Sequence, residues 1–233
     1  MLALVGSCGS SDKPPGPLPN HFQDMYIAAL PLDQKQAIVS AQQNWNVSQM
    51  ETANADAQVK EAESQVHQAR NDQKAAALAV DSANSNKKSA DASKDMNRIN
   101  PAAKELETAK NVQKAADART HYVETYLAYL HRYQRYAQEN MYYREAEYEN
   151  AKAKLAQSNN IAPKDVNFAS YQKQLDDRRS RTDGAKSKAE SAKSSLNSPR
   201  ESWLHAQENA DKANGHAGVY WDPMAPKSGP STL

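Results

Sequence analysis

The chain has 233 residues, of which 29 are Lys or Arg and 28 are Asp or Glu, so its formal net charge at pH 7 is +1. Leu, Ile, Val and Phe together make up only 30 residues, whereas Ala alone accounts for 39. Glycine is absent from Pro17 to Asp183, which argues against folds that rely on glycine in hairpins or phosphate-binding loops. The near-neutral charge gives no general attraction to nucleic acid. Long alanine-rich helices and a disordered polar chain are the two descriptions left open.

The N-terminal stretch, residues 1–8, ends in the only cysteine of the chain, Cys8, after aliphatic and small residues. It resembles a bacterial lipobox, in which this cysteine becomes a lipidated N-terminus, and on that basis the chain resembles bacterial coiled-coil lipoproteins. The stretch is short and no basic residue precedes it, so we expect a truncated signal segment. The alternative is a chance cysteine in a plain N-terminal segment. Residues 9–32 are expected to be a flexible Pro/Ser/Gly tether.

A heptad pattern starts at Ile38 and distinguishes the helical description from the disordered one. Seven of the eight d positions are alanine, and the pattern stays in phase for about 50 residues. These d positions are Ala41, Ser48, Ala55, Ala62, Ala69, Ala76, Ala83 and Ala90. We expect a first helix at about 33–96, starting at a capping box formed by Asp33 and Gln36.

Two further heptad segments follow. The second, with Leu130 and Ala137 on its seam, is expected at about 101–158, with Pro101 in its first turn. The third is expected at about 164–214 with a kink near residue 198, where a Ser-Pro pair interrupts it. Short connections make neighbouring helices antiparallel. The sequence therefore predicts an all-α fold, an elongated antiparallel three-helix coiled-coil bundle at 33–214, with a disordered N-terminal tether and a C-terminal tail at 215–233.

Tyrosines concentrate in the second predicted helix, where seven of the eleven fall between residues 122 and 143. Six of them share one face because they are spaced by 4, 3, 4, 3 and 7 residues. These six are Tyr122, Tyr126, Tyr129, Tyr133, Tyr136 and Tyr143. The first interpretation is that they pack against the third helix or the tail. The second is an exposed surface for self-association, or for an envelope protein or a cell-wall polymer, since tyrosine combines an apolar face with a polar tip.

The tail contains a second aromatic pair, Tyr220 and Trp221, in the one apolar patch outside the predicted helices. It either packs back on the helices or serves as a docking motif for an envelope partner.

Patterns for metal binding and catalysis are lacking in the sequence. No histidine has a glutamate three residues before it, as a di-iron bundle requires, and the His-Glu-x-x-His motif is absent. An extended coiled coil also offers no deep pocket for catalysis. We therefore expect no enzyme activity, no metal and no cofactor.

Basic residues gather only at Lys87-Lys88 and around Arg178, Arg179 and Arg181, where acidic residues are interspersed. The first interpretation is a solvated helix face with ion pairs, and the second is a surface for lipid headgroups.

We expect a non-enzymatic lipoprotein of the bacterial cell envelope, anchored to the outer membrane through Cys8 and facing the periplasm, where its helices act as a scaffold. Two alternatives stay open at this point. One is a membrane-binding module similar in outline to BAR-type helical dimers, and the other is a helical adaptor of an efflux or secretion assembly. Nucleic acid is not an expected partner, and homo-oligomerisation stays open.

Overall fold

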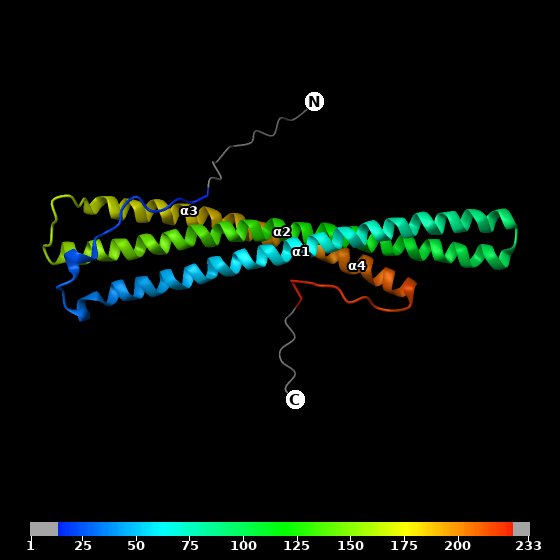
Figure 1. Cartoon of the computed structure of the whole chain (residues 1–233), viewed down its shortest axis with the longest axis horizontal. Coiled ribbons are helices and arrows are strands. Elements are labelled where there is room, and N and C mark those ends of the chain that lie inside the picture. Colours follow the sequence, from blue (N-terminus) through cyan, green and yellow to red (C-terminus); the bar gives the residue numbers. More distant parts are fainter. Residues whose placement is uncertain (1–13, 226–233) are drawn as a thin grey trace, which may run out of the picture. The chain divides into compact units, whose positions relative to one another are not determined.

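A computed structural model describes residues 14–225, and all the long regular elements in this range are α-helices (Figure 1). This confirms the predicted all-α class. In chain order the elements are the 3₁₀ helices η1 (Asp24–Ile27) and η2 (Leu32–Lys35) and the α-helices α1 (Gln36–Ser93), α2 (Met96–Ser158), α3 (Phe168–Ser194) and α4 (Asn197–Asn214).

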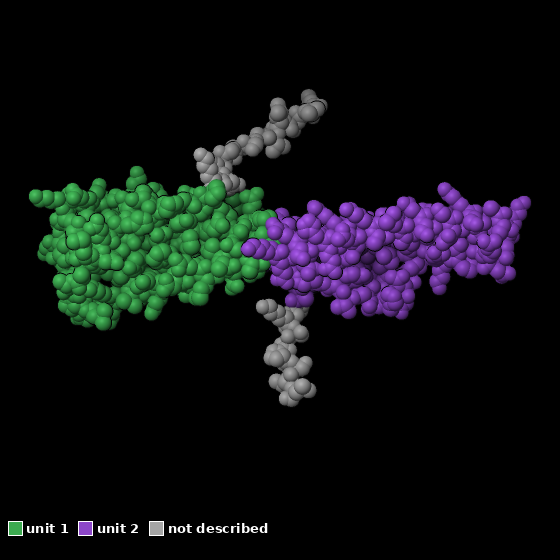
Figure 2. Space-filling model, viewed as in Figure 1, with its two compact units in different colours: residues 1–59, 129–191 green, residues 60–128, 192–233 purple. Residues whose placement is uncertain are grey.

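The chain divides into two compact units, which Figure 2 shows in different colours. Unit 1 contains residues 14–59 and 129–191 of the described range, and unit 2 contains residues 60–128 and 192–225. Both α1 and α2 contribute to each unit, whereas α3 lies mainly in unit 1 and α4 lies in unit 2. Each unit is described below by itself.

The alanine seam of α1 is buried as its heptad pattern predicts. From Ala55 to Ala90 every alanine at a d position is at most 6% exposed. In unit 1 the Thr52 hydroxyl donates to the backbone oxygen of Ala137, and in unit 2 the Thr120 hydroxyl donates to that of Ala69, both at 3.2 Å. These bonds join α1 to an antiparallel α2, and alanine allows the close approach that they require. The coiled-coil geometry of the seam stays a prediction.

The boundaries of the first two helices differ from the expected ones. Asp33 lies inside η2, and α1 begins only at Gln36. Helix α2 begins at Met96, so that Pro101 lies inside it rather than in its first turn. Asp95 provides the cap, since its carboxylate accepts a hydrogen bond from the Asn97 N–H at 2.9 Å. This cap lies six residues before Pro101, and the connection between α1 and α2 has only two residues.

The third predicted helix is two helices. Helix α3 starts at Phe168 after a side-chain cap from Asn167, and ends at Ser194. Helix α4 starts at Asn197, so the interruption lies just before Ser198, where a kink was expected. The heptad phase continues through the break, because Leu196, Trp203 and Ala210 are all buried at seven-residue spacing. Gly215, in a left-handed conformation with φ 75°, ends α4 where the tail was predicted to begin.

The predicted tether is wrong for its described part. Residues 14–27, here called the strap, pack on unit 1, and Leu18, Phe22 and Ile27 are all at most 5% exposed. Phe22 and Ile27 join Ile38 of α1, Ala153 and Ala156 of α2 and Tyr171 of α3 in one core cluster. The sequence did not reveal this role because the side chains that bind the backbone of the strap lie more than 120 positions away along the chain.

The described part of the tail, residues 215–225, packs back on the helices, which was the first interpretation of its aromatic patch. Trp221 and Met224 pack against a cluster in unit 2 that contains Tyr122, Val123 and Trp203. This part of the tail therefore belongs to the folded structure of unit 2.

Candidate functional site: the tyrosine row of α2

The six tyrosines, here called the tyrosine row, share one side of α2. With Gln134 at a and Ala137 at d, all six occupy c and g positions of the heptad. The residues of α2 that hold the strap, Glu149 and Lys152, occupy b and e positions instead. The c/g and b/e positions flank the seam on opposite sides, so the strap leaves the side of the tyrosine row uncovered.

The part of the row in unit 2 is covered by α4 and the tail. Tyr122 is fully buried, and its ring stacks on Trp203 with centroids 5.3 Å apart and an interplanar angle of 11°. Its hydroxyl donates to the Asp222 carboxylate at 2.7 Å. Tyr126 meets Trp221 edge to face at 5.5 Å. For these two residues the first interpretation, packing against helix and tail, is confirmed.

Asp222 is the electrostatic centre of this covered part. Arg200 of α4 donates to it at 2.8 and 3.0 Å. Burial raises the pKa of Asp222, but the hydrogen bonds from Arg200 and Tyr122 outweigh burial and hold that pKa below its ordinary value. Burial, followed by the bond to Asp222, raises the pKa of Tyr122 far above its ordinary value. The group is therefore a neutral phenol donating to a charged carboxylate.

The part of the row in unit 1 is open. Tyr129, Tyr133 and Tyr136 are each half-buried, and successive ring centroids lie 6.2 and 6.0 Å apart. Partial burial raises the pKa of Tyr129 and Tyr133, so both phenols are neutral at physiological pH. These three residues, here called the open tyrosines, each keep part of the side chain accessible to solvent. Tyrosine combines an apolar ring with a polar hydroxyl, which suits stacking with hydrogen bonding.

Tyr143 continues the same side of α2 but is held by neighbouring charges. Its hydroxyl donates to Glu147 at 2.6 Å, and the Arg144 guanidinium lies 5.2 Å from its ring centroid. Further along this side, a groove of about 450 Å³ lies between α1, α2 and α3, lined by Ala37, Glu147, Ala151 and Leu175 among others. The uncovered side of unit 1 is therefore a longer surface than the tyrosines alone.

The tail pair is divided between the interior and the surface. Trp221 is half-buried on Tyr126, whereas Tyr220 is 40% exposed with the Arg119 guanidinium 4.9 Å from its ring centroid. Trp221 thus takes part in the packing of unit 2. Cys8, the predicted lipidation site, lies outside the described residues.

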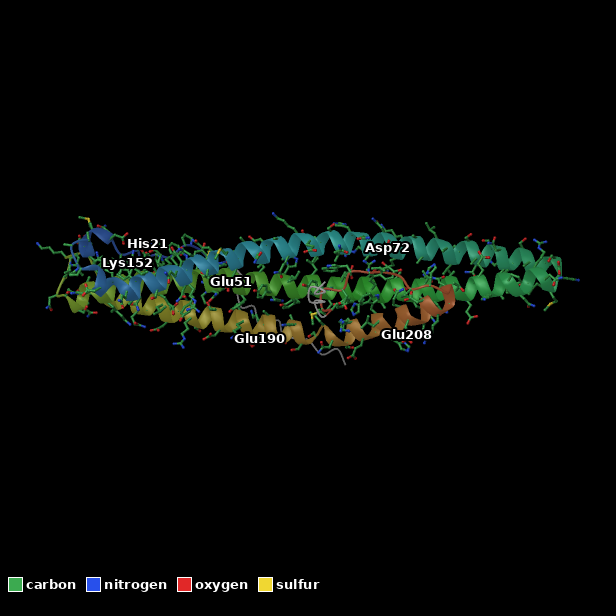
Figure 3. The ribbon with its side chains drawn as sticks, turned by 90° about the horizontal axis from the view of Figure 1, so that it is seen from below. His21, Glu51, Asp72, Lys152, Glu190 and Glu208 are labelled. Atoms are coloured by element: carbon green, nitrogen blue, oxygen red, sulfur yellow. The ribbon has the colours of Figure 1, made fainter. Side chains whose placement is uncertain are left out.

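Four polar residues of α2 and α3 hold the strap, a role that the sequence did not indicate for any of them. Glu149 accepts the Phe22 N–H at 2.6 Å, and Lys152 donates to the Phe22 oxygen at 2.9 Å. Gln174 bonds both the N–H and the oxygen of Asn20, and Arg178 donates to the Gly16 oxygen at 2.7 Å. Figure 3 labels Lys152 close to the strap residue His21, whose ring lies 3.8 Å from Glu149. Of these four, only Arg178 was named from the sequence, in a basic cluster to which another role was assigned.

Three arginines surround the buried side chain of Glu139 in unit 1. Its side chain is 3% exposed, and Arg135 and Arg181 donate to one of its oxygens at 2.8 and 2.9 Å. Arg178 lies 3.8 Å from the other oxygen. The basic residues around position 178 are therefore partly turned inward, toward Glu139 and the strap.

Within residues 14–225, no group of three or more His, Cys, Asp or Glu side chains is placed to hold a metal ion. No helix of this described range is long and apolar enough to cross a bilayer. Comparison with protein-family models, curated proteins and solved structures gave no match.

Proposed function

We propose that the protein is a non-enzymatic, lipid-anchored scaffold of the bacterial cell envelope that holds an envelope partner on the open tyrosines. The observation that carries this proposal is the contrast within one row of tyrosines. Tyr122 is sealed by Trp203, whereas Tyr129, Tyr133 and Tyr136 keep ring area at the surface of a long helix. Solvent-accessible aromatic rings in a contiguous row are typical of binding surfaces.

The strap supports an anchored arrangement. If Cys8 carries the lipid, only six positions separate it from Pro14, the first described residue (14 − 8 = 6). A fully extended chain of that length spans about 20 Å. Since the strap is bonded to α2 and α3, the start of the strap would stay within that distance of the membrane and would tether unit 1 there. A protein held at a fixed height is suited to bridging the membrane to a cell-wall polymer or to another envelope protein.

The membrane-shaping alternative has less support in the charge arrangement. Such a module needs basic side chains that face lipid headgroups. Arg178 is only 7% exposed, and Arg135 and Arg181 are paired with Glu139. The adaptor alternative differs from the scaffold only in its partner, an efflux or secretion channel.

A double variant tests the proposal. Tyr129→Ser with Tyr133→Ser removes two of the three open rings, and Tyr220→Ser is a matched control because it removes a surface tyrosine elsewhere. The binding assay is co-sedimentation of the purified protein with isolated peptidoglycan, accompanied by site-specific photocrosslinking from position 133 in intact cells. We expect the double variant to lose binding or crosslinks while its melting temperature changes little.

Two outcomes would count against the proposal. The first is unchanged sedimentation and crosslinking in the double variant. The second is binding of a Cys8→Ser protein to anionic liposomes, which would favour the membrane-shaping module. Crosslinks from position 133 to a channel protein would identify the partner as an efflux or secretion assembly.

A further inference from the structure

The α1–α2 hairpin of unit 2 extends beyond the end of α4. Helix α4 lies along α1 and α2 until Asn214, where Gly215 ends it. In unit 2, α4 packs on the side of α2 that carries Tyr122, a c position, where Trp203 stacks on this ring. Figure 1 shows α4 stopping well before the turn between α1 and α2. The hairpin arms at about 79–93 and 96–112, here called the hairpin tip, thus lack the helix that covers the rest of unit 2.

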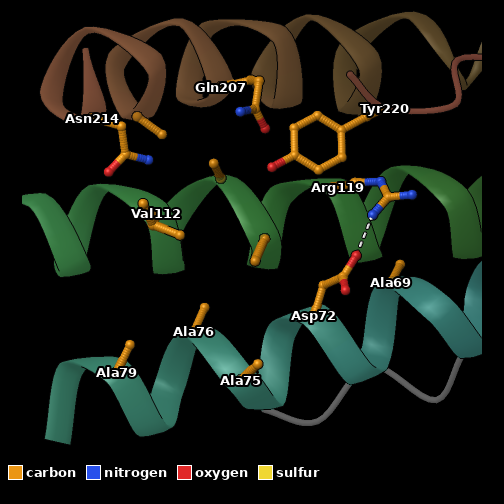
Figure 4. A pocket seen from close by; sticks show the side chains of 13 residues that line it. Ala69, Asp72, Ala75, Ala76, Ala79, Val112, Arg119, Gln207, Asn214 and Tyr220 are labelled. Carbon is orange, nitrogen blue, oxygen red and sulfur yellow. Dashed lines mark hydrogen bonds and ion pairs between the residues drawn. The ribbon is translucent and has the colours of Figure 1, made fainter. Parts of the chain in front are cut away.

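A groove continues from α4 onto this tip. Two adjoining cavities of about 380 and 480 Å³ share Ala79, Val112 and Asn214 in their linings. Figure 4 shows the first cavity, bounded by Tyr220 and by the ion pair of Arg119 with Asp72 at 2.7 Å. The second cavity runs toward the hairpin turn over Ala83 and Ala109. Tyr220 and the Arg119–Asp72 ion pair thus border one end of the groove, and its other end runs along the hairpin tip.

The tip buries very little apolar surface by itself. Within the tip, the buried hydrophobic residues are Val80 at its base and then only Ala83, Ala90 and Ala102, each with one methyl group. Ordering a residue costs conformational entropy, and isolated helices are marginal without tertiary packing. Leu78 and Met96, at the base and the turn of the tip, are 69% and 61% exposed. Contacts between alanines of two helices bury too little apolar surface to stabilise this hairpin well. Another pair of helices packed on the tip would bury more of it.

The groove has the chemistry of a self-complementary surface. Its floor is made of small residues, which allow an identical surface to approach closely. Its charged lining residues beyond α4 are Lys104 and Glu105, whose charges cancel. In a two-fold interface the contact of Lys104 with Glu105 occurs twice, once in each direction. A strongly charged partner would find no complementary charge here.

We propose that a second copy of this chain packs its hairpin tip into this groove, so that two hairpins form a four-helix interface around a two-fold axis. The interface is independent of the open tyrosines, which lie in unit 1, and of any lipid at Cys8.

The first experiment measures the oligomeric state of a Cys8→Ser protein by sedimentation velocity over a range of concentrations. We expect a monomer–dimer equilibrium. Ala79→Glu places a charge in the groove and should weaken the dimer at least tenfold. Ala57→Glu is the matched control, because Ala57 is also an exposed alanine of α1 but lies outside the groove. A monomer at all concentrations, or equal dimerisation of the two variants, overturns the proposal.

A charge reversal tests the two-fold pairing. Lys104→Glu should weaken the dimer, and adding Glu105→Lys to it should restore the dimer, because each copy then offers the reversed pair. A double variant that is as weak as Lys104→Glu would contradict this pairing. Crosslinking with a short bis-maleimide tests the proposal without introducing a charge, in case a charged variant fails to fold. It uses two single-cysteine variants of the Cys8→Ser protein, Thr108→Cys in the groove and Ser89→Cys outside it. Linked dimers from position 108 but not from position 89 are expected, and the reverse pattern refutes the proposal.

Discussion

Tyr122 shows how one buried hydroxyl ties the tail to the helices of unit 2. Its ring stacks on Trp203, and its O–H donates to a carboxylate that Arg200 also binds. Tyr122→Phe keeps the stacking and removes only the hydrogen bond. We expect a loss of about 1–2 kcal/mol in the free energy of unfolding, measured by urea denaturation. The control Tyr143→Phe removes a bond to Glu147 at a more exposed position and should cost less than about 0.5 kcal/mol. Equal losses would contradict the special role of Tyr122.

Asp222 makes the same cluster sensitive to acid. Since its pKa is lower in the folded chain than in the unfolded one, its carboxylate stabilises the fold at neutral pH. This contribution is lost as the pH falls from its ordinary pKa, about 3.9, through the lowered value. Asp222→Asn should therefore be less stable than the wild type at pH 7, with a smaller difference between the two at pH 2.5. Urea denaturation at both pH values tests this, and a difference that does not shrink at low pH would refute it.

At the scale of an element, the strap depends on side chains that belong to α2 and α3. Glu149→Ala removes the acceptor of the Phe22 N–H and leaves the buried Lys152 without its nearest carboxylate. We expect amide exchange in residues 14–27 to become at least tenfold faster, measured by mass spectrometry. Glu147→Ala, two residues away on the other side of α2, is the control. Unchanged exchange in the strap would mean that Glu149 does not hold it.

The alanine seam of α1 leaves no room for side chains larger than alanine. Ala69 is 1% exposed and its backbone oxygen accepts the Thr120 hydroxyl, so a larger side chain must push α2 away. Ala69→Leu should destabilise the chain by about 1–3 kcal/mol, as overpacking does. Ala57→Leu, at an exposed position of the same helix, should stay within about 0.5 kcal/mol of the wild type. Denaturation of both variants in urea gives the comparison, and a tolerated Ala69→Leu would show that the seam is not closely packed.

At the scale of the whole molecule, the proposed anchor decides where the scaffold acts. If Cys8 is lipidated, Cys8→Ser should lower the share of the protein in the membrane fraction of the producing cells, because the variant cannot carry the acyl anchor. Mass spectrometry of the N-terminal peptide should show an acyl modification on the wild type alone. An unmodified cysteine would remove the anchor from the proposal while leaving the tyrosine surface to be tested separately.

The helices and their buried seam followed from the sequence, because a heptad repeat is a local pattern that a single helix must place on one side. Ala55 to Ala90 and the later residues Leu196, Trp203 and Ala210 are buried at the positions that this repeat indicates. Local patterns were less reliable at the ends. Asp95 caps α2, and Pro101 lies inside the helix, so this proline did not mark the first turn as it commonly does.

The sequence by itself determined an all-α chain with an alanine seam, a row of tyrosines on one side of α2 and no recognisable metal motif. Only the tertiary structure decided which tyrosines are covered, because Trp203 and Trp221 lie about 80 and 95 positions after the residues on which they pack. The tertiary structure also makes the strap part of the core, although its composition is that of a tether. Its backbone is bound by Glu149, Lys152, Gln174 and Arg178, and bonds to a backbone leave no signature in the sequence. Contacts between residues so distant along the chain are set by how the helices pack, and no local period contains that information.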